Sequence, residues 1–285
     1  MSNPKGTLYI VATPIGHLAD ISLRAIEVLK TVDLIAAEDT RNSKTLLNAH
    51  LIKTKMTAYH EHNESHKSAL LLEKLTKGLS IALISDAGTP LINDPGYSLV
   101  ETAHTQGIKV VPVPGACALI AALSSSGLAT AKFSFEGFLP RTSGARRKFF
   151  ESYINESKTL IFYESSHRIK ACLMDLAAVY DNSRKMALAR ELTKTFETVV
   201  NGTVEEILEK VSSDNNMQRG EFVVLVEGVS KKANKTAGIS DVASDTLKVL
   251  LEDCSLKTAV KIAVKLSGES KKEMYDLALT LTGKK

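Results

Sequence analysis

Short apolar runs alternate with segments of helical periodicity over the first 115 residues of the chain. In residues 22–32, Leu23, Ile26 and Leu29 recur every three positions, which predicts an amphipathic helix. Four runs have the length and composition of strands, at residues 7–12, 33–38, 80–85 and 109–115. Strands that alternate with helices are typical of a parallel sheet, so we expect an N-terminal α/β domain at 1–115.

A second set of elements follows up to residue 230. The pattern predicts helices at 116–127 and 167–179 and strands at 132–138, 159–165, 186–191, 197–202 and 221–228. The later strands lie close together along the chain, which favours a mixed or partly antiparallel sheet. We therefore expect a second α/β domain at 116–230, with the boundary near Gly115.

The remaining residues have a different composition. Residues 231–240 are polar, rich in lysine and without periodicity, which predicts a linker. Three short helical patterns in 241–285 predict a basic, helix-turn-helix-like module. Lys257, Lys261 and Lys265 are four positions apart and share one helix face, which would face either nucleic acid or water.

Charge and composition narrow the class of protein. Of the 285 residues, 44% are hydrophobic, enough for buried cores in two domains. The net charge of +4 comes from residues 231–285, where eleven lysines face seven acidic residues, and this excess indicates a polyanionic partner. No segment predicts a signal peptide or a membrane span, and the three cysteines lack metal-ligand spacing. We expect a cytoplasmic protein without a disulfide or a metal site.

The segment ISDAGTPLINDPG, residues 84–96, directly follows a predicted strand. Ligands bind at the carboxyl ends of parallel strands, but the chain has no GxxxxGK[ST] motif, and TPIGHL at 13–18 lacks GxGxxG spacing. Asp86 would repel a phosphate and accept hydrogen bonds from a ribose hydroxyl or an ammonium group. A phosphate-free cofactor such as S-adenosylmethionine therefore fits better than a nucleotide. Composition alone more often means an ordinary tight loop.

Several long motifs occur in order between residue 8 and about residue 228. They are LYIVATPIGHLADISLRA, AEDTRNSKTLL, YHEHNE, ISDAGTPLINDPG, VVPVPGACALIAALSSSGL, FEGFLPR, FYESSHRI, ARELTKTFE and GEFVVLVEG. Through them the chain resembles the tetrapyrrole-methylase superfamily. The sequence departs from the usual motifs at Asn93, where serine is common, and at Ser166, where proline is common.

The resemblance implies two α/β domains with S-adenosylmethionine bound in the cleft between them, usually in a homodimer. Within the superfamily, the chain looks like the branch that methylates the ribose 2′-oxygen of a decoding-centre cytidine in 16S rRNA of the small ribosomal subunit. The cofactor contacts that the motifs imply, many of them through the main chain, are Pro14, Ile84, Ser85, Asp86, Thr89, Cys117, Ala118, Glu164 and Leu192.

Two polar segments supply candidates for the chemistry. A ribose hydroxyl is a weak nucleophile, so a carboxylate or a neutral histidine within reach would accept its proton. His60 and Glu61 of YHEHNE are candidates for this role, although the segment also has the composition of a solvated loop. Glu38, Asp39 and Arg41 follow another strand, where they would either hold an RNA phosphate and the ribose or form a structural ion pair.

Basic side chains in the second domain are candidates for RNA contact. Arg141, Arg146 and Arg147 lie in and after a glycine-containing loop, and we expect His167, Arg168 and Lys194 on the wall opposite the first domain. Two other functions stay open: methylation of a tetrapyrrole or another small acceptor, and non-catalytic regulation by nucleic-acid binding. The basic tail favours an RNA substrate over a small acceptor, which has no evident need for it.

Overall fold

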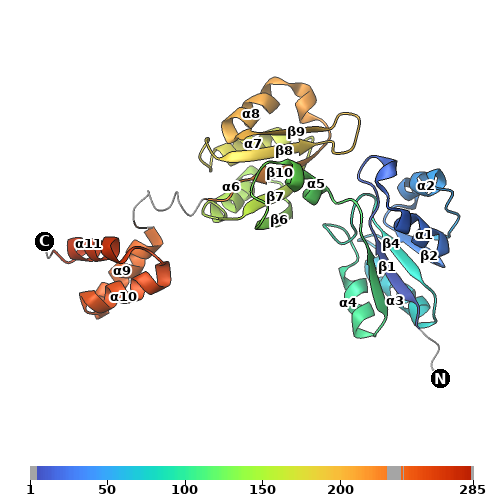
Figure 1. Cartoon of the computed structure of the whole chain (residues 1–285), viewed down its shortest axis with the longest axis horizontal. Helices are drawn as coiled ribbons and strands as arrows, with labels where there is room; N and C mark the ends of the chain where they lie inside the picture. Colours follow the sequence, from blue (N-terminus) through green and yellow to red (C-terminus); the bar gives the residue numbers. More distant parts are fainter. Residues whose placement is uncertain (1–4, 230–238, 240, 284–285) are drawn as a thin grey trace. The chain divides into compact units, whose positions relative to one another are not determined.

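The computed structural model describes residues 5–229, 239 and 241–283. The chain forms two compact units (Figure 1). The first consists of residues 1–154 and 158–227, and the second of residues 155–157 and 228–285. The linker predicted at 231–240 lies outside the described residues except for Ile239.

The first sheet is entirely parallel and has the strand order β3-β2-β4-β1-β5. Its strands are β1 (Thr7–Val11), β2 (Leu34–Ala37), β3 (Met56–Ala58), β4 (Ile81–Ile84) and β5 (Lys109–Val113). The helices between them are η1 (Leu18–Asp20), α1 (Leu23–Thr31), α2 (Thr40–Ala49), α3 (Glu64–Thr76) and α4 (Tyr97–Thr105). The predicted parallel sheet is confirmed; β3, with three residues, was too short for its pattern to be seen.

The second sheet is mixed and has the order β6-β7-β10-β8-β9. Its strands are β6 (Phe133–Phe138), β7 (Thr159–Ser165), β8 (Lys185–Arg190), β9 (Thr198–Thr203) and β10 (Glu221–Val226). Its helices are α5 (Ala118–Ser125), α6 (Ser143–Ser152), α7 (Ile169–Ala177), α8 (Val204–Ser213) and η2 (Asn215–Gln218). β6 and β7 are parallel and the other neighbours are antiparallel, which confirms the expected mixed sheet.

Alternate residues of the central strands enter cores on opposite faces of each sheet. In β4, Ala82 and Ile84 belong to the core beneath α1, whereas Ile81 and Leu83 pack on the other face. This two-sided burial explains why β4 reads as an unbroken apolar run. It also places the carboxyl end of β4, with the loop that follows it, at the edge of a sheet covered on both faces.

The second unit contains α9 (Asp241–Asp253), α10 (Leu256–Ser267) and α11 (Lys271–Leu281), which confirms the three predicted helices. They share a small core that includes Leu247, Val260 and Met274. Gly268 ends α10 in the left-handed conformation, with a φ of 72°. Lys257, Lys261 and Lys265 are all exposed on α10.

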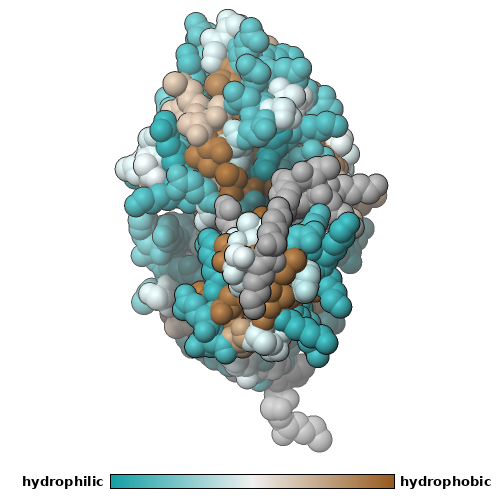
Figure 2. All heavy atoms as spheres, turned by 90° about the vertical axis from the view of Figure 1, so that its left-hand side faces the viewer, coloured by the Kyte–Doolittle hydropathy of each residue, from teal (hydrophilic) through white to brown (hydrophobic). Residues whose placement is uncertain are grey.

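The surface is mostly hydrophilic in the view of Figure 2, with apolar side chains in smaller patches between the polar ones. Within the residues that the structure describes, no helix combines the length and the hydrophobicity that crossing a bilayer would require.

Candidate active site

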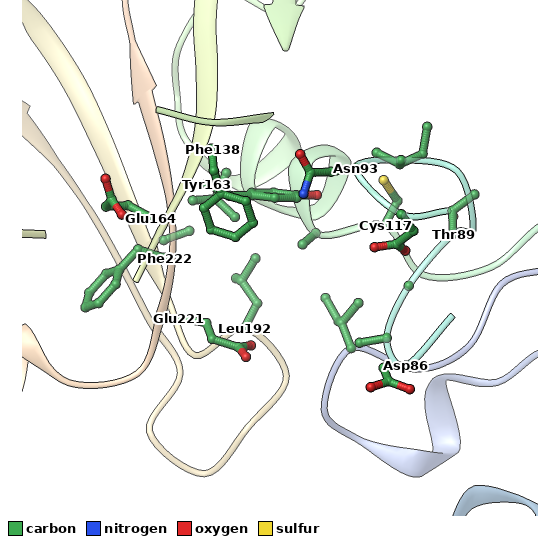
Figure 3. Close-up of a pocket in the computed structure, with 18 of the residues that line it drawn as sticks. Asp86, Thr89, Asn93, Cys117, Phe138, Tyr163, Glu164, Leu192, Glu221 and Phe222 are labelled. Carbon is green, nitrogen blue, oxygen red and sulfur yellow. The ribbon is translucent and has the colours of Figure 1, made fainter. Parts of the chain in front are cut away.

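A cavity of about 380 Å³ lies within the first unit, at the carboxyl ends of the parallel strands. One side is formed by the loop after β4, residues 86–94, and by the start of α5; the other side is formed by β7, β10 and the segment 189–194. Figure 3 shows Tyr163 and Leu192 on one side and Asp86, Thr89 and Cys117 on the other. The volume lies within the range of about 300–1,000 Å³ that is usual for small-molecule sites.

Hydrogen bonds to neighbouring segments hold the loop after β4 in place. Thr13 and Gly88 form a two-bond antiparallel bridge, with N···O distances of 2.9 and 3.0 Å. The Thr89 hydroxyl donates to the Ala116 carbonyl at 3.0 Å, which ties the loop to the segment before α5. Leu91 and Asn93 both have left-handed backbone, with φ of 71° and 69°. Asparagine tolerates this conformation better than most residues, which accounts physically for Asn93 at this position.

Both carboxylate oxygens of Asp86 accept hydrogen bonds within the wall that the residue forms. One carboxylate oxygen accepts the Asp39 amide and the other accepts the side-chain amide of Asn42, both at 2.9 Å. The Asp86 amide in turn donates to Glu38 at 3.2 Å. The loops after β2 and β4 therefore hold each other in place through this carboxylate.

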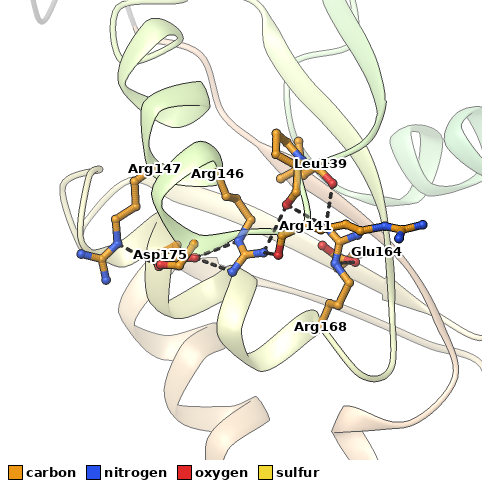
Figure 4. Close-up of polar contacts among 9 residues, drawn as sticks. Leu139, Arg141, Arg146, Arg147, Glu164, Arg168 and Asp175 are labelled. Carbon is orange, nitrogen blue, oxygen red and sulfur yellow. Dashed lines mark hydrogen bonds and ion pairs between the residues drawn. The ribbon is translucent and has the colours of Figure 1, made fainter.

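The cofactor residues expected from the sequence fall into two groups. Six of them line the cavity, namely Asp86, Thr89, Cys117, Ala118, Glu164 and Leu192. The other three, Pro14, Ile84 and Ser85, are buried next to the lining residues. Glu164 contributes its main chain, because its side chain points to the opposite face of β7, toward Arg168 (Figures 3 and 4).

The five catalytic candidates do not come together in the cavity. Glu38 lines it, whereas Asp39 and Arg41 pair with each other at 2.6 Å at the start of α2. The hydrogen bonds from Arg41 lower the pKa of Asp39 to about 2. Glu61 is exposed, and neither it nor His60 is among the lining residues.

Within YHEHNE the structure assigns a clear role to a residue that the sequence reasoning did not single out. Glu64 accepts hydrogen bonds from the Tyr59 hydroxyl at 3.1 Å, the Gly96 amide at 3.1 Å and the Ser98 hydroxyl at 2.9 Å. It thereby fixes the far end of the loop after β4. His60 is held by Asn63, which accepts its amide at 3.0 Å and contacts its ring nitrogen Nε2 at 3.1 Å.

The arginines after β6 are partly internal (Figure 4). Arg146 is 3% exposed, forms an ion pair with buried Asp175, and donates to the carbonyls of Pro140 and Arg141 at 3.3 Å. Arg146 was expected to contact RNA, but its side chain is directed into the core and is not available for such a contact. Arg147 shares Asp175 at 2.8 Å, but half of its side chain is exposed.

The remaining basic candidates for RNA contact differ in exposure and in ion pairing. Arg168 pairs with Glu164 at 3.2 Å and donates to the Leu139 carbonyl at 2.6 Å, so it supports the turn after β6. Arg141 and His167 are exposed. Lys194 lines the cavity and pairs with Glu191 and Glu221 at 3.0 and 2.9 Å. Burial lowers the Lys194 pKa, but the hydrogen bonds to these two carboxylates outweigh it and raise the pKa above its usual value.

The lining residues that the site predictions from the sequence did not name include Asp94, Phe138 and Tyr163. Tyr163 stacks edgewise on Phe138, with ring centroids 5.7 Å apart, and burial raises its pKa to about 12. Burial, together with the nearby charges of Glu38 and Asp86, raises the pKa of Asp94 to about 6. Asp94 was visible in the NDPG motif, but its neighbours come from distant parts of the chain. No group of three or more His, Cys, Asp and Glu residues in the described ranges could hold a metal ion.

The protein is of the α/β class, with two sheets and a cavity at the strand ends. The model of the family described as tetrapyrrole (corrin/porphyrin) methylases matches residues 7–208. The chain belongs to this family and is a methyltransferase. A second model, described as the RsmI C-terminal HTH domain, matches residues 237–282.

The curated relatives place the chain more narrowly. It is 50% identical to ribosomal RNA small subunit methyltransferase I of Haemophilus influenzae over 279 residues, 98% of each chain. It is also 50% identical to the protein of the same name from Escherichia coli O157:H7, over 99% of this chain and 97% of the relative. The chain therefore groups with the family members that carry this name.

Solved structures agree on the fold. Uroporphyrin-III C-methyltransferase from Thermus thermophilus, complexed with S-adenyl homocysteine, matches with a TM-score of 0.53 and 20% identity, over 77% of this chain and 97% of that one. Diphthine synthase matches with a TM-score of 0.59 and 15% identity, over 78% of this chain and 90% of that one. At these identities the likeness shows the fold alone.

Proposed function

We propose that this protein transfers a methyl group from S-adenosylmethionine to the ribose 2′-oxygen of a cytidine in the decoding centre of 16S rRNA. The broader assignment, a small-subunit rRNA methyltransferase that uses this donor, rests on family membership and on 50% identity to relatives of that name along nearly the whole chain. The cytidine and the 2′-oxygen are proposed from the motif resemblance.

The observation that carries the proposal is the charge of the cavity. Its lining includes the carboxylates of Glu38, Asp86, Asp94 and Glu221, while Lys194 is paired with Glu221 and Glu191. Such a wall repels phosphate groups and favours a cation. S-adenosylmethionine carries a positive sulfur and an ammonium group and has no phosphate, so it fits where a nucleotide triphosphate would not.

The start of α5 suits the carboxylate of the same ligand. Cys117 is the N-cap residue, and its side chain makes no capping hydrogen bond to the helix. The first amides of α5 thus lack a side-chain cap where Cys117 and Ala118 line the cavity. Unsatisfied amides and the positive end of the helix dipole both attract an anion. Thr89 and Leu192 would enclose the rest of the ligand.

Positioning is the main catalytic task of these residues. The bound donor supplies a methyl group already activated by its positive sulfur. The rigid loop after β4 and the aromatic pair of Phe138 and Tyr163 would orient the acceptor and exclude water. Of the five catalytic candidates from the sequence, Glu38 lines the cavity. We assign the other four, His60, Glu61, Asp39 and Arg41, to positioning the RNA near the cavity.

Exposed basic side chains would bind the rRNA backbone. In the first unit these are Arg141, Arg147 and His167, with Arg168 and Lys194 in supporting positions. In the second unit they are Lys257, Lys261 and Lys265 on α10. Counterion release from phosphates would make this binding depend strongly on salt. A homodimer remains part of the proposal on the basis of the resemblance.

The test uses S-adenosylmethionine with a labelled methyl group and unmodified small ribosomal subunits. We expect label on one cytidine ribose, and calorimetric binding of S-adenosylmethionine but not of ATP. Label on a base would contradict the 2′-oxygen assignment and leave the donor intact. Binding of ATP or NAD without binding of S-adenosylmethionine would contradict the whole proposal, and transfer to a uroporphyrin-type acceptor instead of rRNA would contradict the substrate.

A further inference from the structure

The cavity holds four acidic side chains that could serve the reaction, and three of them are already engaged. Both carboxylate oxygens of Asp86 accept hydrogen bonds, from Asp39 and Asn42. Glu38 accepts the Asp86 amide at 3.2 Å, and Glu221 pairs with Lys194 at 2.9 Å. Within the described residues, no ion pair engages Asp94, and its polar contact is with the Ser85 hydroxyl.

The backbone fixes Asp94 in place. It follows Asn93, whose φ is 69°, and precedes Pro95 and Gly96, whose φ is 129°. The Gly96 amide is anchored by Glu64 at 3.1 Å. These constraints hold the main chain of Asp94 at the cavity that the residue lines.

We propose that Asp94 is the catalytic residue that accepts the proton of the acceptor hydroxyl, and this inference rests on the proposed function. As the 2′-oxygen forms its bond to the methyl carbon, the methyl–sulfur bond breaks and its electron pair remains on sulfur. The hydroxyl proton passes to the Asp94 carboxylate. The products are the 2′-O-methyl ribose, the neutral thioether and a protonated Asp94, so atoms and charge balance.

The surroundings make Asp94 a stronger base than an ordinary aspartate. The charged groups that face it are Glu38 at the end of β2 and Asp86 after β4, with the Ser85 hydroxyl as a weaker, opposing influence. Tyr163 faces it from β7 and stays neutral, since its pKa is about 12. Burial and the two carboxylates raise the Asp94 pKa from 3.8 to about 6. The carboxylate form therefore predominates at neutral pH, with a proton affinity roughly a hundredfold above the usual value.

The experiment compares full-length wild type with Asp94→Asn and a control, Glu101→Gln, which removes an exposed carboxylate on α4 outside the cavity. We expect the single-turnover rate on unmodified small ribosomal subunits to fall by about 100-fold or more in Asp94→Asn. Calorimetric affinity for S-adenosylhomocysteine should change less than threefold. The wild-type rate should rise with pH through about 6 and then level off, and the variant should lose this rise.

A second readout does not depend on activity. Because the folded state holds the Asp94 proton more tightly than the unfolded chain, the carboxyl lowers wild-type stability as pH rises from about 4 to about 6. The melting temperature of Asp94→Asn relative to that of wild type should therefore increase as the pH rises from about 4 to about 6. At higher pH the difference should stay constant. Glu101→Gln should show no such trend.

The outcomes separate the two proposals. If wild type methylates the subunits and Asp94→Asn keeps the rate and the pH rise, the role of Asp94 is wrong and the proposed function stands. If Asp94→Asn instead loses affinity for S-adenosylmethionine at an unchanged rate under saturation, Asp94 recognises the cation and is not the proton acceptor. If wild type transfers no methyl group to the subunits, the proposed function itself fails.

Discussion

At the scale of single residues, backbone conformation decides where chemistry is placed. Glu191 and Thr193, on either side of the lining residue Leu192, have left-handed φ of 49° and 63°. Leu91 and Asn93 have the same conformation on the opposite wall. In residues other than glycine, left-handed backbone conformation costs on the order of 1–2 kcal/mol of folding free energy per residue. It persists where the surrounding structure enforces it. Both walls of the cavity therefore carry conformations that favour one fixed shape.

Substitution of Gly88 tests whether the cavity depends on this backbone conformation. Its φ is 83°, and an added Cβ would lie 3.3 Å from the Ile15 side chain. We expect Gly88→Ala to lower the free energy of unfolding by about 1–2 kcal/mol and to weaken S-adenosylmethionine binding, because the loop must shift. The control is Gly144→Ala in α6, where no atom lies within 4 Å and φ is not positive. It should be neutral or stabilise by up to about 1 kcal/mol in thermal melting. Equal effects of the two variants would contradict the assigned strain.

At the scale of elements, buried charge joins helices to the turn that borders the cavity. Asp175 on α7 binds Arg146 and Arg147 on α6, and the Ser143 hydroxyl donates to it at 2.7 Å. Arg146 and Arg168 together hold three consecutive carbonyls of residues 139–141. Phe138, which lines the cavity, directly precedes this turn. These ion pairs and hydrogen bonds therefore support the cavity wall that contains Phe138.

The two neighbouring arginines should separate stability from RNA binding. Arg146→Ala leaves the buried Asp175 with one ion-pair partner, so we expect a loss of about 3–5 kcal/mol of unfolding free energy in urea titrations. Arg147→Ala, at a half-exposed position, should cost less than about 1 kcal/mol and should weaken rRNA binding instead. Similar stability losses in both variants would show that their roles are not divided in this way.

At the scale of the whole molecule, the chain consists of two compact units. The first contains the cavity, and the second presents three exposed lysines on α10. Each unit has a hydrophobic core of its own. This organisation predicts that RNA affinity and cofactor affinity can be altered independently.

Charge reversal of Lys257, Lys261 and Lys265 to glutamate should test this division in the full chain. We expect rRNA affinity to fall by at least tenfold and its salt dependence to weaken by about two to three counterions, since three phosphate contacts are lost. Calorimetric affinity for S-adenosylmethionine should stay unchanged. Reversal of Lys74 and Lys210, exposed on α3 and α8, serves as the control. An equal loss of RNA affinity in the control would contradict a specific role for α10.

The sequence by itself determined the class of fold, the strands other than the short β3, and the helices α1, α5, α7 and those of the second unit, because strand and helix periodicity depends on local spacing and on which faces are buried. The turn residues after β4 could also be read from the chain, but they alone predict an ordinary tight loop, and the role of this loop in a ligand cavity was expected only from the resemblance to the family. The tertiary structure decided which side chains reach that cavity. Glu164 turns away from it because residues alternate along β7, Arg146 is drawn into the core, and Asp94 acquires its raised pKa from Glu38 and Asp86, about 56 and 8 residues earlier in the chain. Burial and electrostatic coupling arise between residues distant in sequence, so no local pattern encodes them.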